Sequence, residues 1–255
     1  MNFITFNKLF GYSNRIDVLH GNSKVGTKFR RPSFINVPFQ GALSKNLTQI
    51  LRINNWPTFY FPNGVFISDI NHKNKVPEDY YIYIGRITPE KGVEMAIQFA
   101  RRAGERLIIF GWVQDHTYFR EQVSSKVDGK NIIFMGEQPW KVVENFLVSS
   151  KALLFMSTYD DPQPTVLMEA LSNGVPVIGL KPGYYSGFYD MCNKSNSIVG
   201  ENIEQLLNLK QGLDNLSRDT IRSQTVDNWA WENVIKKIYL PIIEKLRNTT
   251  QIHHK

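Results

Sequence analysis

The sequence predicts an α/β protein built around a Rossmann-like, doubly wound parallel sheet with helices on both faces. From about residue 80 onward, short apolar runs alternate with segments of helical period. The apolar runs are nearly continuous, which is typical of parallel strands that are buried on both faces. With 42% hydrophobic and 21% charged residues in a chain of 255, a buried core is expected and wholesale disorder is not.

The predicted elements follow one another as alternating strands and helices. The expected strands are 80–84, 106–110, 132–135, 152–156 and 175–179, and the expected helices are 93–103, 118–127, 141–149 and 165–173. Sheets of this class bind ligands outside the carboxyl ends of their strands. A last helix is expected at 231–247, where apolar residues recur at helical spacing and Pro241 should introduce a kink.

Residues 1–79 have a different character from the rest of the chain. They are rich in Asn, Phe and Pro, with short strands expected at 17–19 and 34–37 and a helix at 43–53. Because this stretch is too short for a second full doubly wound domain, we expect a small, truncated amino-terminal α/β subdomain. The expected division is a subdomain at 1–65, a sheet domain at 66–228 and a closing helical segment at 229–255 that packs back toward the subdomain.

Charge and cysteine content narrow the classes of partner. The formal net charge of +7 and the pI near 9.3 favour anionic partners, such as phosphates or an anionic membrane surface. The basic residues are scattered and no nucleic-acid-binding fold signature accompanies them, so no nucleic-acid partner is expected. The single cysteine, Cys192, fits a reducing compartment. With no run of about 18 apolar residues and no secretory pattern, we expect a cytoplasmic protein, with peripheral membrane contact as an open alternative.

The segment 158–179 carries two carboxylates, Asp161 and Glu169, on either side of a predicted helix start at Pro164. Proline is tolerated in the first turn of a helix, and Gly174 stands where a C-cap glycine is expected. Asp161 then lies in the loop and Glu169 about one and a half turns into the helix, so both can face one ligand. The amino end of the helix favours phosphate. Taken alone, the pair also fits an ordinary βα unit with a surface Glu.

A second group of residues follows the first predicted strand, where residues 80–92 read YYIYIGRITPEKG. Gly85 permits close backbone approach, the Arg86 guanidinium can fork onto two phosphate oxygens, and Lys91 adds a point charge. Alone, this segment also fits an ordinary capped helix. Together with the carboxylate pair, at another carboxyl edge of the same sheet, it favours binding of a sugar nucleotide through its diphosphate.

In order and spacing, two segments resemble the donor-binding domain of the family 4 glycosyltransferases, retaining enzymes of the GT-B fold: GRITPEKG and DDPQPTVLMEALSNGVPVIG. The resemblance also takes in FPNGV at 61–65, IIFMGEQP at 132–139 and WAWENVIKKIY at 229–239. It covers roughly residues 40–247. It implies that the sheet domain is the GT-B donor-binding domain and that 1–65 is a reduced acceptor-side part.

The resemblance implies roles for the residues that match the family's pattern. Arg86 and Lys91 are expected to bind the donor diphosphate and to stabilise it as the leaving group. Glu169 is expected to hold the ribose hydroxyls. Backbone amides near Thr165 and Val166 are expected to meet phosphate.

Other positions depart from the family's pattern or lie outside its two main segments. Asp161 stands where the family has a Glu that contacts the donor sugar, and its side chain is one methylene shorter. Residues 163–164 read Gln-Pro where family members usually have Phe-Gly. Met135 and Glu137 are expected near the base of the nucleotide. His20 ends a strand similar to one that lends a histidine to the sugar, although a lone His also fits a structural or surface role.

The resemblance implies a hexosyltransferase-type glycosyltransferase that moves a sugar from a nucleotide-sugar donor to an acceptor hydroxyl with retention of configuration. No metal and no cofactor are expected, and the acceptor is a glycan, a lipid or a protein. Because the acceptor half is expected to be reduced, the alternative is a nucleotide-sugar-binding subunit that needs a partner chain to supply that half.

Overall fold

The computed structural model describes residues 4–5, 16–19, 39–42, 45, 48–49, 58–68, 77–182 and 186–245. The strands are β1 Ile4–Thr5, β2 Ile16–Leu19, β3 Phe39–Ala42, β4 Thr58–Tyr60, β5 Tyr80–Ile84, β6 Arg106–Phe110, β7 Ile132–Gly136, β8 Leu153–Phe155, β9 Val177–Leu180 and β10 Ser197–Gly200. The α-helices are α2 Val93–Ala103, α3 His116–Tyr118, α4 Trp140–Ser149, α5 Thr165–Ser172, α6 Phe188–Met191, α7 Ile203–Leu209, α8 Arg218–Trp229 and α9 Trp231–Val234.

The larger of the two sheets has six parallel strands in the order β7-β6-β5-β8-β9-β10. Counted from β5, this order is 3-2-1-4-5-6, which is the strand order of Rossmann dinucleotide-binding domains. The strand order reverses between β5 and β8, so the topological switch point lies there. The predicted fold class is confirmed.

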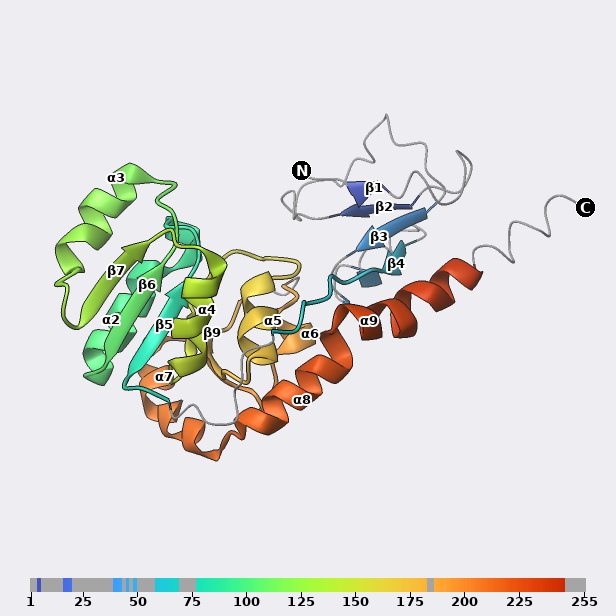
Figure 1. Ribbon diagram of the computed structural model, residues 1–255. Coiled ribbons are helices and arrows are strands. Elements are labelled where there is room, and N and C mark those ends of the chain that lie inside the picture. The colour runs from blue at the N-terminus through green and yellow to red at the C-terminus, as the bar shows by residue number, and fades with distance from the viewer. Residues whose placement is uncertain are drawn as a thin grey trace, which may run out of the picture.

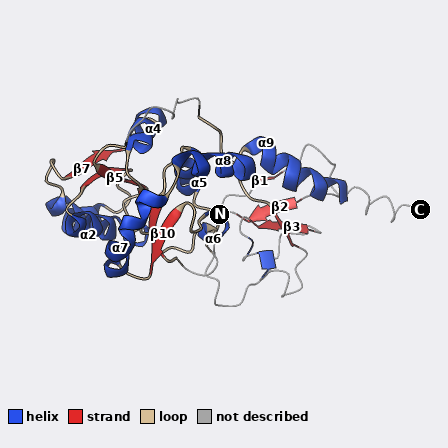
Figure 2. Ribbon diagram, turned by 90° about the horizontal axis from the view of Figure 1, so that it is seen from below, coloured by secondary structure: helices blue, strands red, loops and turns tan. Residues whose placement is uncertain are grey.

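The side chains of β5 are buried on both faces of the sheet. Successive side chains point to opposite sides, and helices cover each side. In β5, Tyr81 and Tyr83 pack in a core cluster with residues of α2 and α7. Tyr80 and Ile82 pack in a second cluster with residues of α4, α5 and α8. Figure 2 shows these two groups of helices on opposite sides of the strands. This packing explains why the apolar runs in the sequence are nearly continuous.

Most element boundaries agree with the sequence predictions, and the differences have local causes. The expected helix at 118–127 was wrong at its start, because the Asp115 side chain accepts a hydrogen bond from the Tyr118 amide and caps the helix earlier. The strand expected at 175–179 begins only at Val177, because Pro176 has no N–H to donate to a ladder.

Four elements of the sheet domain, α6, β10, α7 and α8, were missed by the sequence analysis. The helices α7 and α8 carry side-chain caps that were readable in the sequence. The Asn202 side chain accepts from the Gln205 amide at 2.9 Å, and the Ser217 side chain accepts from the Thr220 amide at 3.3 Å. Such N-cap signals mark a helix start even where the apolar pattern is weak.

The smaller sheet has four strands in the order β1-β2-β3-β4, of which β1 and β2 are antiparallel and the other pairs parallel. Strand β2 agrees with the strand expected at 17–19. The strand expected at 34–37 and most of the helix expected at 43–53 lie outside the described residues.

The chain passes from β4 to β5 through residues 61–79, and its first part, 61–65, contacts the carboxyl-terminal helical segment, which runs from α8 to beneath the four-stranded sheet (Figure 1). The Phe61 and Tyr239 rings meet edge to face, with centroids 4.9 Å apart. Val65 forms a parallel bridge with Ala230. After α9 the helix continues to residue 245 through a π-helical turn at Ile235–Tyr239, which ends two residues before Pro241. A proline removes one helical N–H and crowds the carbonyl four residues back, which accounts for the irregular turn.

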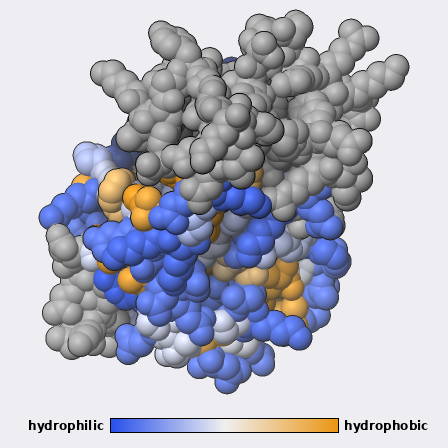
Figure 3. All heavy atoms as spheres, turned by 90° about the vertical axis from the view of Figure 1, so that its right-hand side faces the viewer, coloured by the Kyte–Doolittle hydropathy of each residue, from blue (hydrophilic) through white to orange (hydrophobic). Residues whose placement is uncertain are grey.

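On the face shown in Figure 3, hydrophilic side chains cover most of the described surface and hydrophobic ones gather in small groups. Within the described part of the chain, no helix is both long and apolar enough to span a bilayer.

Candidate functional site

The candidate site is a cavity of about 260 Å³ at the switch point between β5 and β8. A larger cavity of about 590 Å³ lies at the amino ends of the strands, beside the Lys151 to Glu105 ion pair. Another, of about 320 Å³, lies beside Asp190 near α8. Ligands of parallel α/β sheets bind at carboxyl ends and switch points, so the smallest of the three is the functional candidate.

The structure brings together most of the residues that the sequence analysis singled out. The cavity is lined from the β5 side by Gly85, Arg86 and Lys91, and from the α5 side by Asp161, Thr165, Val166 and Glu169. Two of these segments are some 70 residues apart in the chain, as the separation between Lys91 and Asp161 shows. The parallel order of the sheet brings them to one edge.

The position of Lys91 depends on the glycine that follows it. Gly92 has a left-handed backbone with φ of 72°, and a Cβ there would lie 2.0 Å from the Met156 carbonyl oxygen. Only glycine permits this approach, which seats the loop after β5 directly on the chain that leaves β8. The Thr158 amide and the Ser157 hydroxyl both donate to the Glu90 carbonyl, at 2.9 and 3.2 Å, and fasten the same contact.

A buried tyrosine holds the cation-bearing loop from beneath. The Tyr83 hydroxyl is placed to donate to the carbonyls of Arg86 and Lys91, at 3.1 and 3.2 Å. Burial raises the pKa of the Tyr83 phenol well above its usual range, so the hydroxyl keeps the proton that it donates. The backbone that presents both cations is therefore fixed before any ligand arrives.

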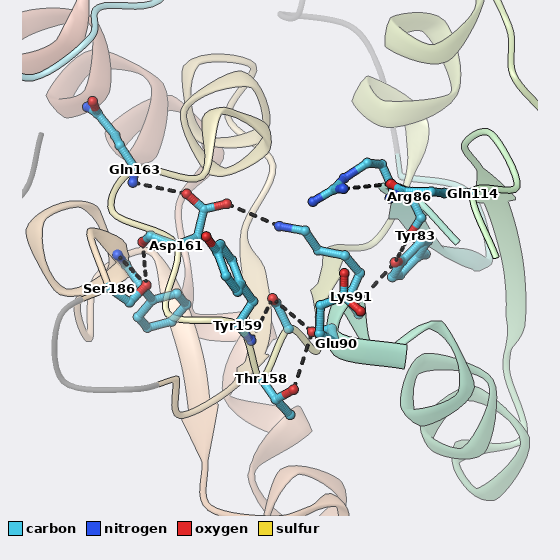
Figure 4. Close-up of polar contacts among 12 residues, drawn as sticks. Tyr83, Arg86, Glu90, Lys91, Gln114, Thr158, Tyr159, Asp161, Gln163 and Ser186 are labelled. Atoms are coloured by element: carbon cyan, nitrogen blue, oxygen red, sulfur yellow. Dashed lines mark hydrogen bonds and ion pairs between the residues drawn. The ribbon is translucent and has the colours of Figure 1, made fainter. Parts of the chain in front are cut away.

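The two cations have different partners (Figure 4). The Lys91 ammonium lies 3.1 Å from the Asp161 carboxylate and 5.1 Å from the centroid of the Tyr159 ring. The Arg86 guanidinium donates to the Gln114 side-chain oxygen at 2.6 Å, which leaves its other N–H groups for a ligand. Arg86 and Lys91 thus bring two positive charges to one side of the cavity.

Asp161 is held in place by its neighbours. Its carboxylate accepts from the Gln163 backbone amide at 3.1 Å as well as from Lys91. Its carbonyl accepts from the Gly187 amide at 2.9 Å and from the Ser186 hydroxyl at 3.0 Å. The loop before α5 therefore presents the Asp161 carboxylate in a defined orientation.

Glu169 lies in the second turn of α5, and its carboxylate makes no hydrogen bond or ion pair with any other described residue. Burial, followed by the nearby negative charge of Glu144, raises the pKa of the Glu169 carboxyl above its ordinary value. A half-buried carboxylate without a donor is costly in an empty site. It is suited to accept hydrogen bonds from the hydroxyls of a ligand.

The amino end of α5 opens into the same cavity. Pro164 is the N-cap residue, no side chain caps the helix, and Thr165 and Val166 line the cavity. The first amides of a helix have no intrahelical acceptor, so this end remains available to an anion. At the other end of α5, the C-cap is Asn173, one residue before the predicted cap, and Gly174 follows it with a left-handed φ of 70°.

Three predicted residues are not among those that line the cavity. Met135 and Glu137 lie at the carboxyl end of β7, two strands away from β5, where Met135 packs partly against the core and Glu137 is exposed. His20 lies outside the described residues. Within the described ranges, no three His, Cys, Asp or Glu side chains gather as metal ligands do.

Several contributors to the site were missed by the sequence analysis. Tyr159 and Gln114 touch the two cations, and Tyr83 supports their backbone. No local pattern distinguishes these residues from ordinary loop and strand residues. The role of Gly92 could have been predicted, because a glycine at a helix start often marks a left-handed or crowded backbone position.

Residues 67–211, more than half of the chain, match the family described as glycosyl transferases group 1. The chain belongs to this family. The comparison with curated proteins gives no match. The coarser part of the predicted resemblance, to glycosyltransferases, is therefore confirmed.

Solved glycosyltransferase structures share the fold. AviGT4, a glycosyltransferase involved in avilamycin A biosynthesis, is 21% identical with a TM-score of 0.66, covering 82% of this chain and 63% of that one. The lipopolysaccharide outer core galactosyltransferase WaaB is 21% identical with a TM-score of 0.64, at 82% and 62% coverage. Sucrose-phosphate synthase from Thermosynechococcus elongatus is 16% identical with a TM-score of 0.67, at 84% and 59% coverage.

At these identities the likeness is one of fold, and it shows a Rossmann-like domain with GT-B glycosyltransferase neighbours. The chain spans 59–63% of the length of these three structures.

Proposed function

We propose that this protein transfers a sugar from a nucleotide-sugar donor to an acceptor hydroxyl. The observation that carries the proposal is the composition of the cavity at the switch point. Two cations, an uncapped helix end and two carboxylates line one space. Cations and helix amides suit a diphosphate, and carboxylates suit the hydroxyls of ribose and sugar.

The cationic side of the cavity is proposed to hold the donor diphosphate. The Arg86 guanidinium can engage two phosphate oxygens, and Lys91 lies where a phosphate would compete with Asp161 for the ammonium. Negative charge grows on the diphosphate as the sugar leaves, and preorganised donors oppose that charge. Because two fixed cations and the α5 amides supply this stabilisation, we propose that transfer needs no metal.

The carboxylate side is proposed to hold the rest of the donor. Glu169 accepts hydrogen bonds from ribose hydroxyls, and Asp161 from the donor sugar. Met135 and Glu137 lie at the carboxyl end of β7, two strands from β5, and are proposed to contact the base of an extended nucleotide.

The stereochemical outcome is proposed from the resemblance to retaining enzymes. The acceptor oxygen forms its bond to the anomeric carbon on the face from which the diphosphate departs. The bond from that carbon to the phosphate oxygen breaks, and the acceptor's proton passes to the leaving phosphate. Arg86 and Lys91 stabilise the oxygen that gains charge.

The acceptor side is proposed to include residues 1–65, with His20 directed toward the sugar, and the acceptor is a glycan, a lipid or a protein. The lining of the cavity by residues of the sheet domain alone favours a second candidate. In that case the protein binds the donor and a partner chain supplies the acceptor half.

The test is a thermal-shift screen with UDP-, GDP-, ADP- and dTDP-sugars, followed by assays of donor hydrolysis and transfer. A ligand at about 100 times its Kd stabilises the folded state by about 2.7 kcal/mol, which corresponds to roughly 5–10 °C for a domain of this size. Stabilisation that Lys91→Ala abolishes supports the site. Binding without turnover until a second protein is added supports the subunit reading, and no stabilisation by any donor contradicts both.

A further inference from the structure

Gln163 belongs to the Gln-Pro pair that departs from the pattern of the resembled family, and its side chain makes two distinct contacts. Its side chain is 6% exposed. The side-chain oxygen accepts from the Asn63 amide at 2.6 Å, and the side-chain nitrogen donates to the Asn63 carbonyl at 3.1 Å. One amide group thus satisfies both backbone polar groups of a residue 100 positions away.

Asn63 belongs to the segment that joins the two sheets, and that segment is held along its length. The Tyr239 hydroxyl donates to the Pro62 carbonyl at 2.9 Å. The Val65 amide donates to the Trp229 carbonyl at 2.8 Å, and the Trp231 amide donates to the Val65 carbonyl at 3.2 Å. Residues 61–65, called the linker below, are therefore held between the carboxyl-terminal helix on one side and Gln163 on the other.

The backbone of Gln163 contacts Asp161, which lines the donor cavity. Its amide donates to one oxygen of Asp161 at 3.1 Å, and the other oxygen of Asp161 lies 3.1 Å from the Lys91 ammonium. A continuous chain of polar contacts runs from Asn63 through Gln163 and Asp161 to Lys91. Both ends of this chain matter for transfer, because one end is the junction of the two sheets and the other is the proposed donor site.

The backbone around Gln163 is restricted in its conformation. A displacement of Asn63 is therefore expected to move Asp161 as well, because the peptide between the two contacts cannot easily change its torsion angles. Prolines at 162 and 164 flank Gln163 and restrict the backbone torsion φ on both sides. A Cβ at Gly187 would lie 2.1 Å from the Pro162 carbonyl oxygen, which shows how tightly the loop is packed from behind. The side-chain nitrogen of Gln163 also lies 3.6 Å from the Met168 sulfur, so the side chain is held against α5 as well.

We propose that Gln163 is a positioning residue that couples the linker between the two sheets to the Asp161 and Lys91 pair. The orientation of the amino-terminal part against the sheet domain then sets the geometry of the carboxylate that meets the donor sugar. This inference rests on the proposed transferase function for its kinetic consequences and on the contacts alone for its structural ones.

The first arm of the test measures the coupling without any substrate. Gln163→Met keeps the length of the side chain and removes both hydrogen bonds to Asn63. Hydrogen exchange should then quicken in residues 63–65 and also in 158–161 and 186–187, which Gln163 does not touch through its side chain. The matched control is Gln205→Met, which removes the 2.6 Å bond from the Glu201 amide on the exposed side of α7. Faster exchange in residues 63–65 alone would overturn the proposal.

The second arm measures turnover of a sugar donor. Small misplacements of a reacting geometry can cost about 100-fold in rate, so we expect kcat/KM of Gln163→Met to fall roughly 10- to 100-fold with the fold retained. Gln163→Glu should be equally impaired at about pH 8, because a carboxylate would face the Asn63 carbonyl. Because burial at this position raises the pKa of a carboxyl, its turnover relative to wild type at the same pH should recover at about pH 5, where the protonated acid donates as the amide does. Wild-type kinetics for folded Gln163→Met, or no recovery of Gln163→Glu at low pH, would overturn the proposal.

The two arms separate this inference from the proposed function. If wild-type protein neither binds nor turns over a sugar nucleotide, the transferase proposal fails, and the exchange experiment still decides whether Gln163 couples the linker to the cavity.

Discussion

Asp161 and Glu169 line the same cavity and meet opposite surroundings. Asp161 is paired with the Lys91 ammonium and with a backbone amide, each at 3.1 Å. Glu169 has no polar partner among the described residues, and burial raises its pKa. One carboxylate is satisfied in the ligand-free protein and the other is not.

The difference shows that the site is not uniformly prepared for its ligand. Asp161 already forms an ion pair with Lys91, so a bound sugar nucleotide must replace or share that contact. Glu169 has given up solvation without compensation, so a ligand hydroxyl that donates to it gains an interaction for which little must be broken. Removing groups on each side of this comparison should have effects of different kind and size.

The largest effect is expected from Lys91→Ala, which removes the cation beside Asp161 and leaves the Gln163 backbone amide as a partner of its carboxylate. Loss of a preorganised contact to developing charge typically lowers the rate by about 10²- to 10³-fold. Donor hydrolysis and transfer should fall by that factor while circular dichroism shows an intact fold. Arg86→Ala should act in the same direction.

The matched control for this experiment is Lys126→Ala, which removes an ion pair with Glu94 of 2.6 Å outside the cavity. It should retain wild-type turnover. Undiminished turnover by folded Lys91→Ala protein would rule out its assignment to the diphosphate.

A smaller effect, on binding rather than on chemistry, is expected from Glu169→Gln. Hydrogen bonds to charged groups contribute about 1.5–3 kcal/mol, so affinity for the nucleotide should fall roughly 10- to 100-fold. Because a ribose contact is made in both the ground state and the transition state, KM should rise while kcat changes little. Calorimetry with nucleotide diphosphates measures the affinity, and steady-state kinetics measures KM and kcat. A fall in kcat with unchanged KM would place Glu169 at the reacting centre instead.

The same variant should have the opposite effect on the ligand-free protein. A carboxyl whose pKa is raised by folding contributes full stability below its ordinary pKa of 4.5 and loses it as the pH rises through the raised value. Glutamine does not ionise, so Glu169→Gln should melt at a higher temperature than wild type near neutral pH. The two melting curves should converge below the ordinary pKa. A difference that does not depend on pH would contradict this account.

The smallest effect is expected from Asp161→Glu, which gives the carboxylate the length that the sequence resemblance implies and keeps the charge beside Lys91. Stability and overall affinity should change little. The ratio of kcat/KM values between donor sugars should shift several-fold, because the longer arm meets different hydroxyls. Equal changes for every donor tested would show that Asp161 does not select the sugar.

The sequence predicted the elements of the sheet domain well because their signals are local. The strand at 80–84 and the helix at 93–103 carry unbroken apolar patterns and agree with β5 and α2 residue for residue. Gly85, Arg86 and Lys91 were identified because they follow a strand, and Asp161 and Glu169 because a proline marks the helix between them. The apolar pattern of α8 is weak, so the sequence did not predict this helix.

What the sequence determined by itself was the fold class and the two short segments that carry charge, because strand period, proline and glycine act within a few residues. The tertiary structure decided how those charges are used. Gly92 packing on Met156 brought Lys91 to Asp161, while the position of Glu169 in α5 left its carboxylate half-buried and unpaired. Contacts between residues 70 and 100 positions apart, such as Lys91 with Asp161 and Asn63 with Gln163, depend on the strand order and on close packing, which no local pattern encodes.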